Sequence, residues 1–267
     1  MTTLYWFSGT GNSLAVARAL AQRLDDATLV PIASLPANGT IVPTSKRIGI
    51  VCPVYFYSLP LLVKEFLDRL DPSHADYTFL VLTMGGLPGM AAHHARRRFR
   101  RAGRRLDAAF SVGMPGNYIA MYNARGRESA QRMAARAEAA TQRIASAVAA
   151  QRARRSIGRL ALLPFSALIY AAIGRRFAAD CRGRDERFTV TDACTSCGTC
   201  VRVCPVNNIG IVDGRPIWRH RCEQCFACVH FCPTEAIQIP GTRSAARRRY
   251  HHPGVTVEEI EAQCTMD

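Results

Sequence analysis

The sequence predicts an α/β domain followed by a small α+β domain, and two observations lead to this interpretation. Over residues 1–155, apolar runs rich in β-forming residues alternate with helix-like patterns; such alternation is typical of a parallel sheet covered by helices. Eight of the eleven cysteines lie within residues 194–233. A chain of 267 residues is long enough for two domains with separate cores.

The first elements are a predicted strand, Thr3–Phe7, a loop over residues 8–13, and the start of a helix. The loop is Ser8, Gly9, Thr10, Gly11, Asn12 and Ser13, and the apolar face of the helix is Leu14, Ala17, Ala21 and Leu24. Backbone N–H groups and a helix dipole that point to the same place form an anion cradle. The loop lacks the Gly-Lys-Ser/Thr ending of a P-loop and the third glycine of the dinucleotide motif. A hydroxyl-rich loop without lysine suits a terminal monophosphate.

The remaining strands place further candidate residues at one edge of the predicted sheet. We expect these strands at Thr28–Ile32, Arg47–Cys52, Tyr77–Thr83 and Leu106–Val112, with a helix at Leu61–Leu70. Ligands of an open α/β sheet lie beyond the carboxyl ends of its strands. The segments at those ends contain Pro53, Val54, Tyr55, Phe56 and Tyr57, then Met84, Gly85 and Gly86, and then Asn117 and Tyr118.

Two helical segments are expected before the cysteines. Arg125–Arg155 has apolar residues at helical spacing and a basic outer face, which indicates the last helix of the sheet domain. Leu160–Ile173 is apolar but too short to span a bilayer. We expect a linker helix buried between the domains; a membrane-surface segment is the alternative.

The cysteines form two runs with the pattern C-x₂-C-x₂-C-x₃-C-P. This is the bacterial [4Fe–4S] signature, in which the fourth cysteine of each run ligates the other cluster. One cluster would be held by Cys194, Cys197, Cys200 and Cys232, and the other by Cys222, Cys225, Cys228 and Cys204. Zinc sites use cysteine pairs instead of such triplets, and a disulfide framework would require an exported chain. Between the runs, Ile209–Val212 and Pro216–Trp218 indicate a hairpin.

These motifs together resemble a known family. Phe7-Ser8-Gly9-Thr10-Gly11-Asn12-Ser13 is similar to the FMN-phosphate loop of flavodoxins, and with the eight cysteines the chain resembles the flavodoxin–ferredoxin fusion proteins of bacteria and archaea. Gly113–Tyr118 and Arg247–Pro253 resemble further stretches of that family. The resemblance covers nearly the whole length.

The resemblance implies a flavodoxin-like doubly wound parallel sheet over residues 1–155, a linker helix region at 156–186, a 2[4Fe–4S] ferredoxin domain at 187–240 and a C-terminal tail at 241–267. It implies FMN at the residues named above. As a group, Tyr55, Phe56 and Tyr57 would place one ring against the flavin, although for each of them alone a core position is favoured over contact with the flavin. Gly85 and Gly86 would let backbone amides approach its edge. Asn117 and Tyr118 would lie between flavin and clusters, or form a structural turn.

The net charge and the first residues indicate which class of partner and which compartment to expect. The formal charge is +15, from 35 Lys and Arg against 20 Asp and Glu. No nucleic-acid recognition motif is present, so we expect an acidic redox partner protein and no nucleic acid. The first residues lack the features of a signal peptide, which favours the cytoplasm. Cys52 directly precedes the aromatic residues, and we expect a buried strand cysteine there; a redox-active cysteine is the alternative. Cys181 and Cys264 follow no spacing rule and are treated as spare thiols. His251 and His252 could tune a cluster, but packing is favoured.

Two functions fit these motifs. One is an electron-transfer protein that passes electrons between two [4Fe–4S] clusters and FMN. The other is a ferredoxin-fed, FMN-dependent reductase of a small organic substrate. A substrate pocket over the flavin would favour the reductase, and a flavin face covered by the ferredoxin domain would favour electron transfer. Direct oxidation of NAD(P)H is not expected, because the dinucleotide fingerprint is absent.

Overall fold

A computed structural model describes residues 1–153 and 163–264. Its first domain is a five-stranded parallel sheet with strand order β2-β1-β3-β4-β5. This is the flavodoxin-like order of a doubly wound sheet, as predicted. The strands are β1 (Thr2–Trp6), β2 (Ala27–Pro31), β3 (Arg47–Pro53), β4 (Tyr77–Met84) and β5 (Ala108–Gly113). All five predicted strands are therefore present, with ends shifted by no more than two residues.

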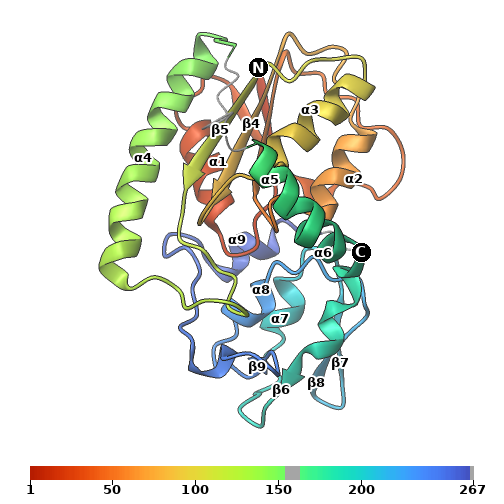
Figure 1. The fold of residues 1–267 in the computed structure, drawn as a ribbon, viewed down its shortest axis with the longest axis vertical. Helices are drawn as coiled ribbons and strands as arrows, with labels where there is room; N and C mark the ends of the chain where they lie inside the picture. Colours follow the sequence, from red (N-terminus) through yellow and green to blue (C-terminus); the bar gives the residue numbers. More distant parts are fainter. Residues whose placement is uncertain (154–162, 265–267) are drawn as a thin grey trace.

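Helices cover both faces of this sheet (Figure 1). They are α1 (Asn12–Ala21), α2 (Leu61–Arg69), α3 (Ala91–Arg101) and α4 (Arg127–Ala149), with a 3₁₀ turn at Ile32–Ser34. α1 packs against α4, and α2 packs against α3. The centre of the sheet is so tightly filled that a Cβ on Gly49 would lie 2.4 Å from the Phe79 ring.

Helix α3 was not predicted from the sequence. Its buried residues are Ala91, Ala92, Ala95 and Phe99, and most of its other positions are arginine or histidine. A buried face made of alanine is a weak apolar signal, because alanine adds little hydrophobic area. The arginines therefore dominate the pattern in the sequence.

The linker helix is present but is not buried between the domains. It runs through α5 (Leu163–Ile169), a π-helical stretch at Tyr170–Gly174 and α6 (Arg175–Asp180). Phe165 is 53% exposed, Leu168 68% and Ile173 54%, so burial of this segment was a wrong prediction. Residues 160–162 of the predicted segment lie outside the described residues. Within residues 1–153 and 163–264, no helix is long and apolar enough to cross a membrane.

The cysteine-rich domain is a small α+β unit below the sheet domain in Figure 1. After a 3₁₀ segment at Arg182–Arg187, its elements are β6 (Thr189–Val190), α7 (Thr199–Arg202), β7 (Ile209–Val212), β8 (Arg215–Trp218), α8 (Ala227–His230) and β9 (Ile237–Gln238). β7 and β8 pair as the predicted hairpin, and β6 pairs with β9.

The C-terminal segment returns to the sheet domain. After a 3₁₀ turn at Ser244–Ala246 it forms α9 (Val257–Glu261), which lies between the two domains in Figure 1. Val255 and Ile260 belong to the core of the sheet domain. Glu259 forms an ion pair with Arg18 of α1 at 2.8 Å. Residues 241–264 are thus packed structure and not a free tail.

Candidate functional site

A pocket of about 320 Å³ opens at the carboxyl ends of β1, β3, β4 and β5. Every residue proposed to bind FMN lines it except Gly11. Gly11 instead supports the loop from outside, because its φ of 90° is left-handed and a Cβ there would lie 2.8 Å from Val255 Cβ. Ser8, Thr10 and Ser13 are buried in the loop. The volume suits a ligand of cofactor size.

Hydrogen bonds hold the loop at residues 8–13 in place. Asn12 Nδ2 donates to the Pro115 carbonyl at 2.9 Å, and the Ser13 hydroxyl lies 2.8 Å from that of Thr83 on β4. Asn117 Nδ2 donates to Thr10 Oγ1 at 2.9 Å. The first N–H groups of α1 have no acceptor within their own helix. They therefore remain free to bind an anion at the loop.

The aromatic residues after β3 have different roles. Phe56 stacks on Phe177 of α6 with ring centroids 3.3 Å apart and is met edge-on by Tyr118. The Tyr55 hydroxyl is buried and has no hydrogen-bond partner among the described residues. Burial raises the pKa of Tyr55 well above its usual value. An unpartnered hydroxyl at the pocket wall fits a bound group that can hydrogen-bond to it.

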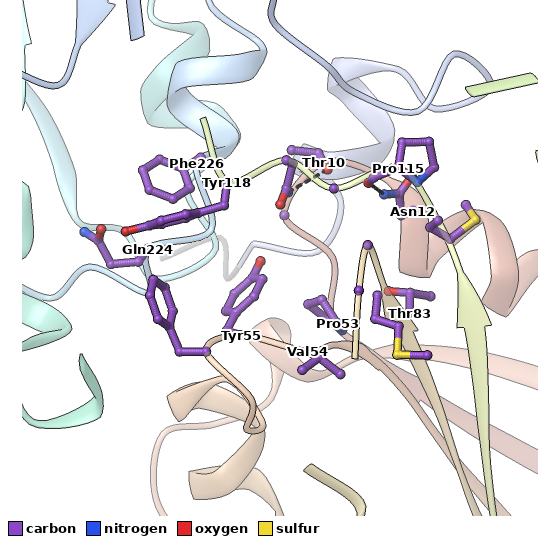
Figure 2. A pocket seen from close by; sticks show the side chains of 18 of the residues that line it. Thr10, Asn12, Pro53, Val54, Tyr55, Thr83, Pro115, Tyr118, Gln224 and Phe226 are labelled. Carbon is purple, nitrogen blue, oxygen red and sulfur yellow. Dashed lines mark hydrogen bonds between the residues drawn. The ribbon is translucent and has the colours of Figure 1, made fainter. Parts of the chain in front are cut away.

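The second cysteine run forms part of the same pocket. Gln224 and Phe226, which lie between its cysteines, line the pocket with Tyr55 and Tyr118 (Figure 2). The Phe226 and Tyr118 rings are 5.2 Å apart. The loop at residues 8–13 lies so close to the second cysteine run that a Cβ on Gly9 would lie 2.6 Å from the Cys225 carbonyl oxygen. Only glycine permits this approach between the two domains.

The eight cysteines surround two separate cavities. Cys194, Cys197, Cys200 and Cys232 line one, and Cys204, Cys222, Cys225 and Cys228 line the other. These are the two sets expected from the motif. Among the described residues, no three His, Cys, Asp or Glu side chains are close enough to hold a single metal ion. Four cysteines around each cavity match the number of ligands of a [4Fe–4S] cluster.

Backbone N–H groups point at several of these sulfurs. Cys204 Sγ accepts from Asn208 N at 3.3 Å, Cys222 Sγ from Gln224 N at 3.2 Å, and Cys232 Sγ from Ala236 N at 3.3 Å. Burial raises the pKa of the Cys225 and Cys228 thiols well above the usual value. Bare thiolates would be unfavourable there, so these cysteines would ligate as thiolates only beside the positive charge of a bound metal cluster.

His230 joins the two domains and was missed by the sequence analysis. It is 3% exposed and lies between Cys228 and Cys232. Its Nδ1 accepts from the Tyr250 N–H at 3.1 Å, so Nε2 carries the proton and donates to the Asn117 carbonyl at 2.7 Å. Burial lowers the pKa of His230 to about 4. The neutral ring therefore ties the second run to the pocket rim and to the C-terminal segment.

The C-terminal segment also clasps the loop at residues 8–13, which no sequence pattern indicated. The fully buried Gln263 side chain accepts from Ser8 N at 3.2 Å and donates to the Ser8 carbonyl at 2.7 Å. His252 N donates to the Thr10 carbonyl at 2.7 Å, and the Tyr250 hydroxyl donates to Asn12 Oδ1 at 2.8 Å. The loop is therefore held from both sides.

The spare histidines and thiols pack without a visible chemical role. His251 stacks on Phe231 at 4.6 Å, and His252 Nδ1 accepts from Gly254 N. Cys52 is buried in β3, as expected, and burial raises its pKa. Cys181 Sγ donates to the Cys222 carbonyl at 3.6 Å, and Cys264 Sγ donates to the Arg202 carbonyl at 3.2 Å.

The chain was compared with known families, curated proteins and solved structures. Residues 193–237 match the family model of the 4Fe-4S dicluster domain. The search of curated proteins found no match. An archaeal flavodoxin is 13% identical over 55% of this chain and 97% of its own, with a TM-score of 0.37. Megasphaera elsdenii flavodoxin is 18% identical over 53% of this chain and 99% of its own, with a TM-score of 0.35.

A third solved structure, an FMN-dependent NADH-azoreductase from Bacillus anthracis, is 11% identical over 56% of this chain and 100% of its own, with a TM-score of 0.40. Similarities this low carry no argument about activity, and the fold assignment depends on the strand order of the sheet. The chain joins a flavodoxin-like sheet domain to a 4Fe-4S dicluster domain, as a flavodoxin–ferredoxin fusion does.

Proposed function

We propose that this protein transfers electrons between two [4Fe–4S] clusters and FMN. The observation that carries the proposal is the shared wall of the pocket. Gln224, Phe226 and the Cys225 backbone belong to the second cysteine run, and they contact the loop and the aromatic residues of the flavodoxin-like domain. A cluster held by that run would lie directly beside a ligand in the pocket.

The first cysteine cavity, the second cysteine cavity and the pocket also differ in how far they lie from solvent. Cys197 is exposed, whereas Cys204, Cys222, Cys225 and Cys228 are all buried. The first cavity is therefore the one that an external partner can approach, and the second lies between it and the pocket. When bound, the clusters would exchange single electrons and FMN could hold one or two.

The protein's own residues would bind and shield these groups. The N–H groups at the start of α1 and the hydroxyls of Ser8, Thr10 and Ser13 suit a terminal phosphate. Tyr55 offers its free hydroxyl to the ligand, and Phe226 with Tyr118 excludes water between the pocket and the second cavity. The absence of lysine in the loop favours FMN over a diphosphate cofactor.

We further propose that the partner is an acidic redox protein that approaches the exposed first cavity. The formal charge of +15 would steer such a protein by long-range attraction.

One observation favours the reductase alternative. The pocket opens to solvent beside Leu87, Met121 and Tyr122, which are 42%, 68% and 45% exposed. A small apolar substrate could enter there. Turnover of such a substrate by the reduced protein would support this alternative.

The deciding experiment follows electrons within one chain. The clusters of anaerobic holoprotein are reduced rapidly with a photochemical donor, and the flavin absorbance is recorded. We expect the rate of flavin reduction to be independent of protein concentration, because the sites share one chain. A rate that increases in proportion to concentration would contradict internal transfer. Extraction of the flavin should yield FMN, and recovery of FAD would contradict the assignment of the loop.

A further inference from the structure

Large apolar side chains are exposed on the linker helix and at the mouth of the pocket. On the linker helix these are Phe165, Leu168 and Ile173, and around the pocket mouth they are Leu87, Met121 and Tyr122. The helix packs inward through Ser166, Gly174 and Phe177. Phe165, Leu168 and Ala172 follow helical spacing on its outer side. No element within residues 1–153 and 163–264 covers this apolar stripe, and such a patch marks an interaction surface.

A strongly basic cavity lies against the same helix. Its walls are Lys64 of α2, Arg97, Arg98 and Arg101 of α3, and Tyr170, Ala171 and Arg175 of the linker helix, with His94 at the base. α5 and α6 run beside α2 and α3 in Figure 1, and the Tyr170 and His94 rings are 4.6 Å apart. The cavity encloses about 540 Å³ and is open to solvent.

The positive charge in this cavity is poorly compensated. Asp68 pairs with Arg98 at 2.9 Å, but Lys64, Arg97, Arg101 and Arg175 have no ion-pair partner within residues 1–153 and 163–264. Burial and the nearby Arg98 lower the pKa of Lys64. His94 contributes no charge near neutral pH, because burial lowers its pKa to about 4. A cluster of cations in a concave site where only Arg98 has a counter-ion among the described residues suits phosphate groups.

We propose that this face docks on a membrane surface rich in anionic phospholipid. The cations of the cavity bind lipid phosphates, and Phe165 and Leu168 enter the boundary between head groups and acyl chains. The helix lies in the membrane plane, because it is too short and too basic to cross. The phosphate of a soluble ligand would account for the cavity but not for the apolar stripe beside it. Because Ile173 lines the pocket mouth, docking also brings that mouth to the membrane.

The test measures co-sedimentation of full-length holoprotein with vesicles. Phosphatidylcholine vesicles with phosphatidylglycerol should bind the protein, and vesicles of phosphatidylcholine alone should not. Arg97→Gln/Arg101→Gln should weaken binding about thirtyfold, since each cation near an anionic surface contributes roughly 1 kcal/mol. Phe165→Ser/Leu168→Ser should weaken it by at least about tenfold, and the remaining binding should disappear as salt increases.

The matched control is Arg132→Gln/Arg136→Gln on the exposed part of α4, which removes the same charge with the same spacing on another face (Figure 1). It should bind vesicles as the unchanged protein does, and flavin and cluster absorbance should show that all variants are folded. Equal loss in the control would mean unspecific charge attraction and would overturn the proposal. The proposal would also be overturned if the protein does not bind the vesicles, including the case in which the cavity binds inorganic phosphate or pyrophosphate alone. It would be overturned, too, if the protein forms a dimer that Leu168→Ser dissociates.

Discussion

The two cysteine runs share one spacing but face different surroundings. Between its first three cysteines, the first run has Thr195, Ser196, Gly198 and Thr199, and the second has Glu223, Gln224, Phe226 and Ala227. In the first run Cys197 is exposed, whereas the second run is buried against the flavodoxin-like domain. The spacing of the cysteines thus defines the cavity, and the residues between them decide which surface it meets.

One pair of equivalent residues shows how the surroundings of the two runs differ. Gly198 and Phe226 occupy the same place in the two runs, and both are left-handed, with φ of 73° and 58°. Glycine adopts this conformation without strain, but a bulky residue does not. Phe226 is nevertheless 3% exposed, packed near Tyr118 and Phe188 and lining the pocket. Its packing between the domains offsets the backbone strain.

The largest expected effect tests how the runs exchange ligands. Cys204→Ala should remove the buried cluster and leave the exposed one, although Cys204 belongs to the first run. Cys232→Ala should do the reverse. Each variant should retain about four of roughly eight irons per chain. Iron analysis and electron paramagnetic resonance would identify the cluster that remains. Loss of the exposed cluster in Cys204→Ala would contradict the crossed pairing.

Phe226→Gly should lower the free energy of unfolding by about 1–4 kcal/mol. Loss of a buried phenylalanine costs about 3–5 kcal/mol, and relief of the left-handed strain returns about 1–2 kcal/mol. Denaturant unfolding of holoprotein measures the change, and FMN affinity should also fall. Gly198→Ala is the counterpart in the exposed run. No atom lies within 4 Å of its added Cβ, so only backbone strain should appear. An undiminished stability in Phe226→Gly would show that this side chain does not join the domains.

Glu223→Ala should cost about 1–2 kcal/mol of unfolding free energy. The Glu223 carboxyl is 3% exposed and accepts from Leu62 N, in the first turn of α2, at 3.1 Å. Its removal leaves that N–H without this acceptor. Thr195, at the same position of the first run, is exposed, so Thr195→Ala should stay within about 0.5 kcal/mol. Equal effects in the two variants would mean that the runs do not differ in how they contact the rest of the chain.

The smallest expected effect is a difference in salt dependence between electron transfer at the exposed cavity and electron transfer at the buried one. Electron uptake from an acidic redox protein should slow as ionic strength rises, because the attraction acts through solvent. Transfer between the second cavity and the pocket should keep its rate, because it occurs inside the chain. Stopped-flow traces at several salt concentrations resolve the two phases. An internal phase that slows in parallel with uptake would contradict this division.

The sequence alone determined features that depend on local spacing. The five strands follow from runs of buried residues, and the cysteine sets follow from the C-x₂-C-x₂-C-x₃-C-P pattern. The loop at residues 8–13 was visible because a strand, small polar residues and a helix start are consecutive. Each of these signals lies within a few residues of chain.

Tertiary structure alone decided which surfaces meet. Gln263 reaches Ser8 across 255 positions of sequence, and His230 reaches Asn117 across 113. The linker helix was expected to be buried because its residues are apolar, yet Phe165 and Leu168 face outward. Hydrophobic periodicity shows that a segment can bury a face, but burial depends on which other elements cover it. Contacts between residues far apart in the chain determine which elements cover a segment, and no local sequence pattern shows those contacts.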